Sequence, residues 1–300
     1  MLTKNEIKQY ALSLSVPAVG VCGVERDEEL LHHLNKRRET FPLCEFEEEN
    51  VAKRVDVKLL MPEAESVLVC LYPYHLKDLP KGNISCYAAV PDYHTVVGEI
   101  LNDIAEFIQN KEPEAKCLGV CDTSPLVDRW LAYRAGLGFY GKNNALIHPV
   151  YGSYFFIGAL LLNFPLEADE PMKLSCMGCD RCIKACPGGA LTEEFGFDCS
   201  RCVSFLTQSK ILSPEQEEIL ALQQSVYGCD VCQAVCPHNQ QVPDTPIEAF
   251  YNERLTTLEQ SEIEALSGRG FKKKYQHYSF SWCSKNTILK NFKVLQKEKQ

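Results

Sequence analysis

The chain is marked by the run Cys176-Met-Gly-Cys-Asp-Arg-Cys-Ile-Lys-Ala-Cys-Pro187 and, further along, by Cys229-Asp-Val-Cys-Gln-Ala-Val-Cys-Pro237. These runs are nearly two copies of the pattern C-x2-C-x2-C-x3-C-P, in which three closely spaced thiolates hold one [4Fe-4S] cluster. The Cys before the Pro lies farther along the backbone and ligates the other cluster. The two runs are therefore halves of one unit, and the sequence predicts two [4Fe-4S] clusters.

The two runs supply seven cysteines, one fewer than two cubane clusters with four thiolates each require. Crosswise pairing predicts that one cluster is held by Cys176, Cys179, Cys182 and Cys236. The other cluster is then held by Cys186, Cys229, Cys232 and one cysteine from outside the runs. Cys199 and Cys202 lie just before the second run, and the number of ligands does not choose between them.

Zinc knuckles and disulfides are the alternative uses of C-x2-C pairs. Zinc sites need neither the Cys-Pro endings nor a third closely spaced cysteine, and a disulfide framework needs an oxidising compartment. Residues 1–20 show no basic, long apolar or small-residue signal pattern, so export is not expected. No apolar stretch is long enough to cross a bilayer. We therefore expect a cytoplasmic protein that makes no membrane contact.

The net charge of −9 hides a basic C-terminal end. Residues 269–300 contain one acid, Glu298, and nine cationic residues: Arg269, Lys272, Lys273, Lys274, Lys285, Lys290, Lys293, Lys297 and Lys299. The rest of the chain is strongly acidic and would repel a polyanion, whereas this end would attract one. A nucleic-acid contact and a solvated helix face with snorkelling lysines both fit the pattern.

Helical and strand patterns alternate through the first half of the chain. The expected helices span residues 4–15, 92–110 and 125–135, and the expected strands span residues 18–24, 66–72, 116–121 and 154–162. This alternation predicts an α/β (α+β) domain over residues 1–170. Residues 171–245 then form a ferredoxin-like double-cluster module, and residues 246–300 form a short basic helical segment. Within the module, Ser213-Pro-Glu-Gln216 has the capping residues of a helix start.

The stretch Gly136-Leu-Gly-Phe-Tyr-Gly141 matches the dinucleotide-binding pattern G-x-G-x-x-G, but its surroundings differ from such a site. The pattern needs a strand before it and a carboxylate about twenty residues later. Here a helical stretch precedes it, and residues 152–166 contain no acid. We instead expect a helix stop followed by a turn, or close approach of the backbone to another ligand.

Several further segments occur together in a shared order and spacing. They are residues 53–67, Asp92-Tyr-His94, Asp122-Thr-Ser-Pro-Leu126, Arg134-Ala-Gly-Leu-Gly138, Gly141-Lys-Asn143, Tyr151-Gly-Ser153, Arg201-Cys-Val-Ser204 and Ser281-Trp282. With both cysteine runs, they resemble the epoxyqueuosine reductase family, cobalamin-dependent iron–sulfur enzymes of tRNA modification that are related to the reductive dehalogenases. The resemblance runs nearly from end to end.

The resemblance implies that the N-terminal domain binds cobalamin and that the two clusters relay electrons to it from an external low-potential donor. The implied reaction removes the epoxide oxygen from epoxyqueuosine at the wobble position of tRNA, giving queuosine and water. The family pattern also implies that Cys202 is the remaining cluster ligand. We expect the enzyme to be a monomer.

Asp122 matches the proton donor proposed for the family. An apolar corrin and substrate beside it would raise its pKa and keep it protonated near neutral pH. A helix N-cap is the alternative, because Asp122 stands just before Pro125 and an apolar helical stretch. If Asp122 is catalytic, its neighbour Thr123 or Ser124 would serve as the cap.

The resemblance also implies residues that contact the cofactor. Tyr93 and His94 fall near the family's active centre and are expected in the cobalamin or substrate pocket. His94 is not expected to ligate cobalt, because residues 92–98 miss the pattern D-x-H-x-x-G by one position. The corrin amides or the phosphate of the nucleotide tail are expected to contact Arg129, Arg134, Lys142, Asn143 and Ser153. A purely structural role is the alternative for each of these residues.

One departure from the family keeps other functions open. Full-length members continue into a C-terminal HEAT-like repeat that helps bind tRNA, whereas this chain stops soon after residues 286–292. Phosphate contacts made by the basic end are the expected compensation. The alternatives are a cobalamin-dependent iron–sulfur reductase of a small molecule and a two-cluster electron-transfer protein without cobalamin.

Overall fold

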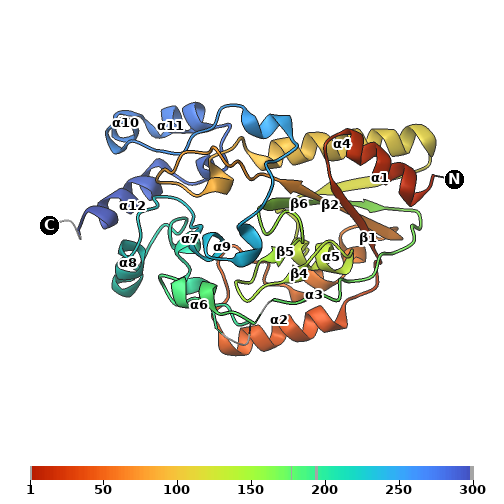
Figure 1. Cartoon of the computed structure of the whole chain (residues 1–300), viewed down its shortest axis with the longest axis horizontal. Coiled ribbons are helices and arrows are strands. Elements are labelled where there is room, and N and C mark those ends of the chain that lie inside the picture. The colour runs from red at the N-terminus through yellow and green to blue at the C-terminus, as the bar shows by residue number, and fades with distance from the viewer. Residues whose placement is uncertain (1, 177, 193–194, 298–300) are drawn as a thin grey trace.

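The structure, a computed structural model, describes residues 2–176, 178–192 and 195–297 (Figure 1). Glu298 and Lys299 of the basic end lie outside the described residues. The N-terminal sheet and its helices occupy one end of the molecule, and the cysteine-bearing segments and last helices occupy the other. Within the described part of the chain, no helix combines the length and apolar character needed to span a membrane.

A four-stranded sheet in the order β1-β2-β6-β3 forms the centre of the N-terminal part. Its strands are β1 (Ala18–Cys22), β2 (Ser66–Pro73), β3 (Cys117–Val120) and β6 (Phe155–Leu162). All three pairings are antiparallel, and β2 pairs with β6 from Ser66 opposite Leu162 to Pro73 opposite Phe155. Every residue of β2 is buried. The mixed class expected from the sequence is confirmed, and the antiparallel pairing makes it the α+β form.

Helices cover both faces of this sheet (Figure 1). On one face lie α1 (Lys4–Ser13) and α4 (Tyr93–Lys111), and on the other lies α5 (Asp128–Arg134). The apolar stripe of α4 has the helical spacing that packs against a sheet, and it buries Val96, Val97, Leu101, Ile104 and Ile108. At the end of α5 the backbone approaches β1 closely, because a Cβ on Gly20 would lie 2.1 Å from the carbonyl oxygen of Ala135.

Two helices and a hairpin were not expected from the sequence. They are α2 (Glu28–Thr40), α3 (Val51–Val55) and the pair β4 (Phe139–Tyr140) and β5 (Leu146–Ile147). α2 is capped by Asp27, whose side chain accepts a hydrogen bond from the backbone N–H of Leu30. It buries only Leu30 and Leu34. An apolar stripe this narrow among charged residues does not give a recognisable helical pattern in the sequence.

Local stop and start signals agree with the structure at two places. Helix α8 (Pro214–Ala221) begins with the expected capping box, in which the side chains of Ser213 and Gln216 each accept a backbone N–H. After α5, Gly136 has a φ of 69°, which confirms a helix stop and turn at the glycine-rich pattern. The start of α5 differs, since the helix begins at Asp128 and not near residue 125.

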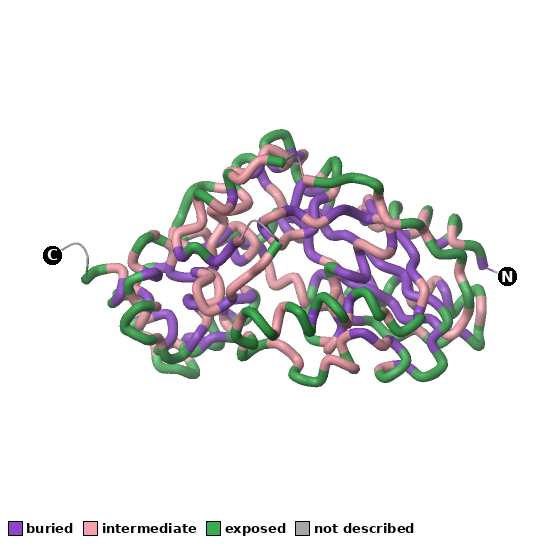
Figure 2. Tube along the Cα trace, turned by 90° about the horizontal axis from the view of Figure 1, so that it is seen from below, coloured by how far each residue is buried: buried purple, intermediate pink, exposed green. Residues whose placement is uncertain are grey.

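The cysteine-bearing region consists of short helices packed against the last part of the chain. Its helices are α6 (Arg181–Ala185), α7 (Val203–Leu206), α8 and α9 (Val231–Ala234), and the last helices are α10 (Gln260–Ala265), α11 (Gly268–Tyr275) and α12 (Lys285–Lys297). Val294 of α12 packs with Leu206 and Leu220 in a small core. Figure 2 shows less buried chain here than around the sheet, so the fold of this region depends less on apolar burial.

Asn239 joins the cysteine-bearing region to the sheet domain. Its Nδ2 donates to Ser153 Oγ and to the carbonyl oxygen of Gln233, both at 2.9 Å, and its Oδ1 accepts the Ser153 N–H at 2.8 Å. Gly152 is required beside it, because a Cβ there would lie 2.0 Å from Asn239 Oδ1. The division into residues 1–170, 171–245 and 246–300 stays a prediction.

We predict that Asn239→Ala lowers the stability of the cluster-loaded protein by about 2 kcal/mol, because it leaves the buried N–H of Ser153 without its acceptor. The midpoint of denaturant unfolding under anaerobic conditions measures this change. Asn110→Ala, at an exposed position on α4, is the matched control and should stay within about 0.5 kcal/mol of the parent. An equal midpoint for the two variants would show that the junction does not depend on Asn239.

Candidate functional site

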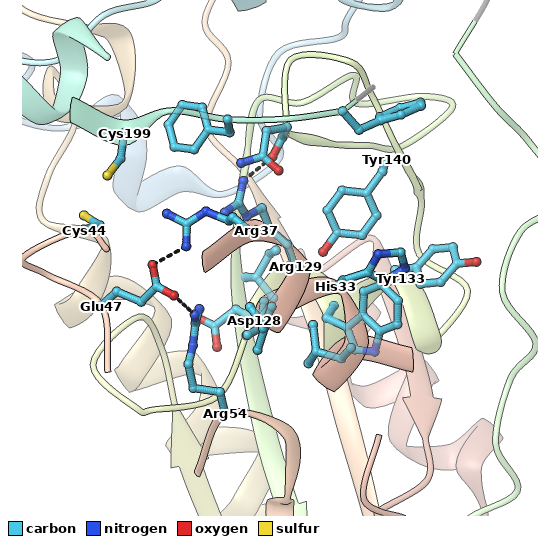
Figure 3. Close-up of a pocket in the computed structure, with 18 of the residues that line it drawn as sticks. His33, Arg37, Cys44, Glu47, Arg54, Asp128, Arg129, Tyr133, Tyr140 and Cys199 are labelled. Atoms are coloured by element: carbon cyan, nitrogen blue, oxygen red, sulfur yellow. Dashed lines mark hydrogen bonds and ion pairs between the residues drawn. The ribbon is translucent and has the colours of Figure 1, made fainter. Parts of the chain in front are cut away.

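A cavity of about 1410 Å³ lies between α2, α5, β6 and the segment that carries Cys199 and Cys202 (Figure 3). Among the residues expected at the site, it is lined by Tyr93, Asp122, Arg129 and Cys202. Phe155 and Phe156 of β6 line it from the sheet. The cavity therefore has an aromatic wall on the sheet side and a cysteine-bearing wall opposite.

Two residues from the first turn of α4 hold the side chain of Asp122. Tyr93 Oη donates to Asp122 Oδ2 at 2.6 Å, and His94 Nε2 lies 3.6 Å from the same oxygen. Asp92 caps α4 by accepting the backbone N–H of His94, and its carboxylate lies 2.7 Å from His94 Nδ1. The Tyr93 ring stacks against Phe156 of β6 at 4.2 Å. The segment Asp-Tyr-His therefore starts a helix and directs two polar groups at Asp122.

Asp122 does not cap the helix that follows it. Helix α5 has Val127 at its N-cap position, with no side-chain cap bond, so Thr123 and Ser124 are not its caps either. Ser124 Oγ instead accepts the backbone N–H of Leu126 at 3.3 Å, a local turn that delays the start of the helix. The alternative cap assignments from the sequence were wrong for this reason.

In the protein alone the pKa of Asp122 is lowered, and the raised value expected beside a corrin and substrate stays a prediction. The ion pair with His94 at 3.6 Å is the largest cause, loss of hydration opposes it, and the hydrogen bond from the Tyr93 hydroxyl adds to the lowering. The Asp122 side chain is 63% exposed, so water screens part of this effect. The contact with Asp122 and then the one with Asp92 raise the pKa of His94 to about 9. Near neutral pH, His94 therefore carries the proton of this pair and Asp122 is ionised.

The two predicted arginines of α5 lie in different places. Arg129 lines the cavity and donates to the backbone oxygen of Asn144. Arg134 lies at the other end of α5, where its guanidinium pairs with Asp27 Oδ2 at 2.9 Å. Only Arg129 is therefore placed beside Asp122.

The other three residues expected to contact the cofactor are not among those that line the cavity. Lys142 and Asn143 lie in the turn between β4 and β5, where Asn143 is buried and its Nδ2 has no partner among the described residues. Ser153 is buried and bonded to Asn239 and Gln233. Their assignment to the cofactor stays a prediction.

The cysteines of the two runs lie on helices α6 and α9, which pack together, and on the loops beside them. Their electrostatic neighbours divide them into two groups. Burial raises the pKa of Cys182, and the neighbouring Cys176 and Cys236 raise it further. Burial also raises the pKa of Cys236, and Cys179 is among its neighbours. Cys236 of the second run thus lies with the first three cysteines.

The second group brings together cysteines from both runs and Cys202. Burial raises the pKa of Cys229 and Cys232, and Cys202 and Cys186 add to the rise in each. All sixteen cysteines fall within the described residues and are free thiols. The disulfide alternative is therefore wrong for this structure.

Cys199 faces away from both groups. Figure 3 shows the Cys44 and Cys199 side chains beside each other in the cavity wall, and Cys199 lowers the pKa of the Cys44 thiol to about 7. The Cys199 thiol also lies 3.7 Å from the carbonyl oxygen of Pro42. The side chain of Cys199 is thus engaged with the loop after α2.

Charged residues of the cavity that the sequence analysis missed lie on α2, on α3 and between them. Glu47 is 9% exposed and accepts a hydrogen bond from Arg37 at 2.6 Å and another from Arg54 (Figure 3). A buried carboxylate needs such partners. Asp128 was missed as well. Its position one residue before Arg129 was the only available signal, because the sequence did not place the start of α5 correctly.

Most cations of the basic end are used within the protein. Lys272, Lys285 and Lys290 donate to backbone carbonyl oxygens, and Lys274 and Lys297 pair with Glu262 and Glu217. Within residues 195–297, the cations of this end with no ion-pair or hydrogen-bond partner are Arg269, Lys273 and Lys293. Contacts within the protein therefore use much of this charge, which neither interpretation from the sequence predicted.

Comparison with protein families matches two parts of the chain. Residues 175–239 match the family model described as a 4Fe-4S double cluster binding domain. Residues 54–123 match the family model described as epoxyqueuosine reductase QueG, DUF1730. The second match ends one residue after Asp122 and includes Tyr93 and His94.

Individual relatives match nearly the whole chain. It is 35% identical over 306 residues to the epoxyqueuosine reductase of Bacillus subtilis, covering 96% of this chain and 77% of the relative. A crystal structure of an epoxyqueuosine reductase with an epoxyqueuosine-modified tRNA-Tyr stem loop matches with a TM-score of 0.88 and 34% identity, covering 97% of this chain and 80% of that one. A Bacillus subtilis structure with its catalytic aspartate loop swung out of the active site has a TM-score of 0.84, with the same identity and coverage. The chain therefore belongs to the epoxyqueuosine reductase family.

Proposed function

We propose that this protein reduces epoxyqueuosine to queuosine at the wobble position of tRNA, using cobalamin and electrons relayed by two [4Fe-4S] clusters. The reaction adds two electrons and two protons and releases the epoxide oxygen as water. The observation that carries the proposal is that one cavity is lined by both Asp122 and Cys202. Proton supply and electron supply thus meet at one place.

The proposed cluster ligands follow the two groups of cysteines. One cluster is assigned to Cys176, Cys179, Cys182 and Cys236, and the other to Cys186, Cys202, Cys229 and Cys232. The electrostatic neighbours within each group support this assignment. Bound clusters supply one-electron transfer. The position of Cys202 on the cavity wall puts the second cluster nearer the substrate.

The cavity suits a large, flat cofactor whose rim carries amides. Its volume of about 1410 Å³ exceeds that of ordinary small-molecule pockets, so it has room for a corrin and a nucleoside together. Bound cobalamin supplies a metal centre that is nucleophilic when reduced. Phe155 and Phe156 offer an apolar wall to a flat ring, and Arg129 offers hydrogen-bond donors. Both ring nitrogens of His94 face carboxylates, so His94 is proposed to handle protons and not metal.

Asp122, Tyr93 and His94 are proposed to deliver the proton to the leaving oxygen. His94 holds a proton at neutral pH because two carboxylates flank it. Asp122 shares that proton and lines the cavity, so it is the group that can present the proton to substrate. The loop that carries Asp122 is proposed to correspond to the catalytic loop named in the Bacillus subtilis relative.

The tRNA is proposed to approach the mouth of this cavity. The relative solved with an epoxyqueuosine-modified stem loop supports this partner. Arg269, Lys273 and Lys293 are the cations of the basic end left to contact phosphates, so we expect a small contribution from this end. An external low-potential electron donor and a monomeric enzyme complete the proposal.

The function is tested by loading the protein anaerobically with iron, sulfide and cobalamin and supplying tRNA that carries epoxyqueuosine. The wild type should give queuosine by nucleoside analysis. Asp122→Asn should lower turnover by about 100-fold or more, because it removes the carboxylate that passes the His94 proton to the substrate, with iron and cobalamin contents unchanged. Asp103→Asn, at an exposed position on α4, is the control and should keep full turnover.

Three outcomes would contradict parts of the proposal. Full turnover by Asp122→Asn removes Asp122 from the acid role. Cobalamin and iron bound without conversion by the wild type would favour reduction of a small molecule. Failure of the wild type to bind cobalamin would favour the electron-transfer alternative.

The ligand assignment predicts different results for two neighbouring cysteines. Cys199→Ser should keep about eight irons per chain, as two cubane clusters require, because Cys199 is engaged with Cys44. Cys202→Ser should lose up to about half of the iron, because it removes a thiolate ligand. Iron and sulfide analysis of anaerobically loaded protein measures both variants. Equal iron loss in the two would place the ligand elsewhere.

The proton relay predicts an alkaline limit on activity. His94 has a raised pKa in the folded protein, so its proton is present below about 9 and is lost as the pH rises through that value. We expect kcat/KM to fall across the same range. Asp92→Asn should move this limb to lower pH, because one of the two carboxylates that hold the proton is neutralised. If kcat/KM falls over the same pH range in the wild type, in Asp92→Asn and in His94→Gln, His94 is excluded from the proton relay.

A further inference from the structure

The backbone at Asp122 adopts a conformation that needs outside support. Its φ is 59°, a left-handed value that residues other than glycine adopt rarely. The Thr123 N–H donates back to the Cys121 carbonyl oxygen at 2.6 Å, which closes a tight three-residue turn around Asp122. Such a turn persists only where surrounding contacts hold it.

Asp128 makes one such contact from the start of α5. Its Oδ2 accepts the backbone N–H of Asp122 at 2.9 Å. This bond spans six residues and fixes the loop against the helix. Asp128 lines the cavity with Arg129, whose charge favours the ionised carboxylate (Figure 3). The loop is thus held on its backbone by Asp128 and on its side chain by Tyr93 and His94.

The Asp128 carboxylate is half-buried, so it loses part of its hydration. Burial raises the pKa of Asp128 to about 7, although the bond from the Asp122 N–H lowers it in part. Loss of hydration disfavours a charged group here unless specific partners replace the water. The Asp128 carboxylate accepts a hydrogen bond from the Asp122 turn, which a small apolar residue at position 128 could not do.

We propose that Asp128 is the positioning residue of the catalytic loop, whose carboxylate oxygen holds the Asp122 backbone so that the Asp122 side chain meets Tyr93 and His94. The inference rests on the proposed function for the role of Asp122. The hydrogen bond itself is observable without turnover. Asp128 acts through an acceptor oxygen, and it is not the source of the proton.

Two substitutions separate these roles. Asp128→Asn keeps an acceptor oxygen and removes the acid, so turnover should stay within about threefold of the wild type. Asp128→Ala removes the acceptor, and kcat should fall by about 10- to 100-fold with KM little changed, because the loop is misplaced and substrate contacts remain. Asp128→Glu keeps the charge but displaces the acceptor oxygen, so its kcat should lie between those of Asp128→Asn and Asp128→Ala.

Hydrogen exchange at the Asp122 amide, resolved to single residues by mass spectrometry of the loaded holoenzyme, tests the bond directly. Exchange should be about tenfold faster in Asp128→Ala than in the wild type and nearly unchanged in Asp128→Asn. Asp244→Ala, which removes a similar bond to the Lys77 N–H at 2.6 Å outside the cavity, should leave the Asp122 amide and kcat unaffected.

The outcomes that overturn the proposal are distinct from failure of the function. Equal loss of kcat in Asp128→Asn and Asp128→Ala would mean that Asp128 acts through its charge or proton. Unchanged exchange of the Asp122 amide in Asp128→Ala or, if that variant does not fold, in Asp128→Glu would mean that Asp128 does not hold the loop. If the wild type does not convert epoxyqueuosine, the exchange measurement still decides whether Asp128 holds the turn.

Discussion

The antiparallel pairing of β2 with β6 is the constraint on which the rest of the structure depends. Helices cover both faces of this pair, so β2 is buried along its whole length and β6 nearly so. β6 also pairs with β3, with Val120 opposite Ala159, which brings the loop after β3 over the sheet. Phe156 of the same strand stacks against Tyr93. One strand therefore aligns the start of α4 with the loop that carries Asp122, although the two are distant in sequence.

Apolar periodicity and cysteine spacing were strong enough to predict the sheet strands, α1, α4 and the two-cluster module from the sequence. The signals failed where burial is slight or where contacts are long-range. α2 is largely exposed and buries only Leu30 and Leu34, so its pattern was too weak. The raised pKa of Asp122 was predicted for a carboxyl beside a corrin and substrate. In the protein alone the ion pair with His94, a contact between residues distant in sequence, lowers that pKa.

Two further parts of the cavity lining differ in chemistry. The sheet side offers aromatic rings, whereas Arg37, Glu47 and Arg54 form a charged group on the α2 and α3 side (Figure 3). Burial lowers the pKa of Arg54, and Glu47 opposes that change. The contacts of Arg37 and Arg54 with Glu47 keep one side of the cavity polar. The aromatic side of the cavity suits a flat apolar part of a ligand, and the charged side suits an anionic or amide-rich part.

The contact between Asn239 and Ser153 couples cluster binding to the formation of the substrate site. Asn239 lies three residues after Cys236 and bonds to Ser153 beside β6, so the geometry of a cluster-binding loop is transmitted to the strand that lines the cavity. Because metal binding contributes folding free energy to such loops, delivery of iron and assembly of the substrate site become a single maturation step. We therefore expect loss of iron to loosen the contact between Asn239 and Ser153 and, through it, the cavity wall formed by the following strand.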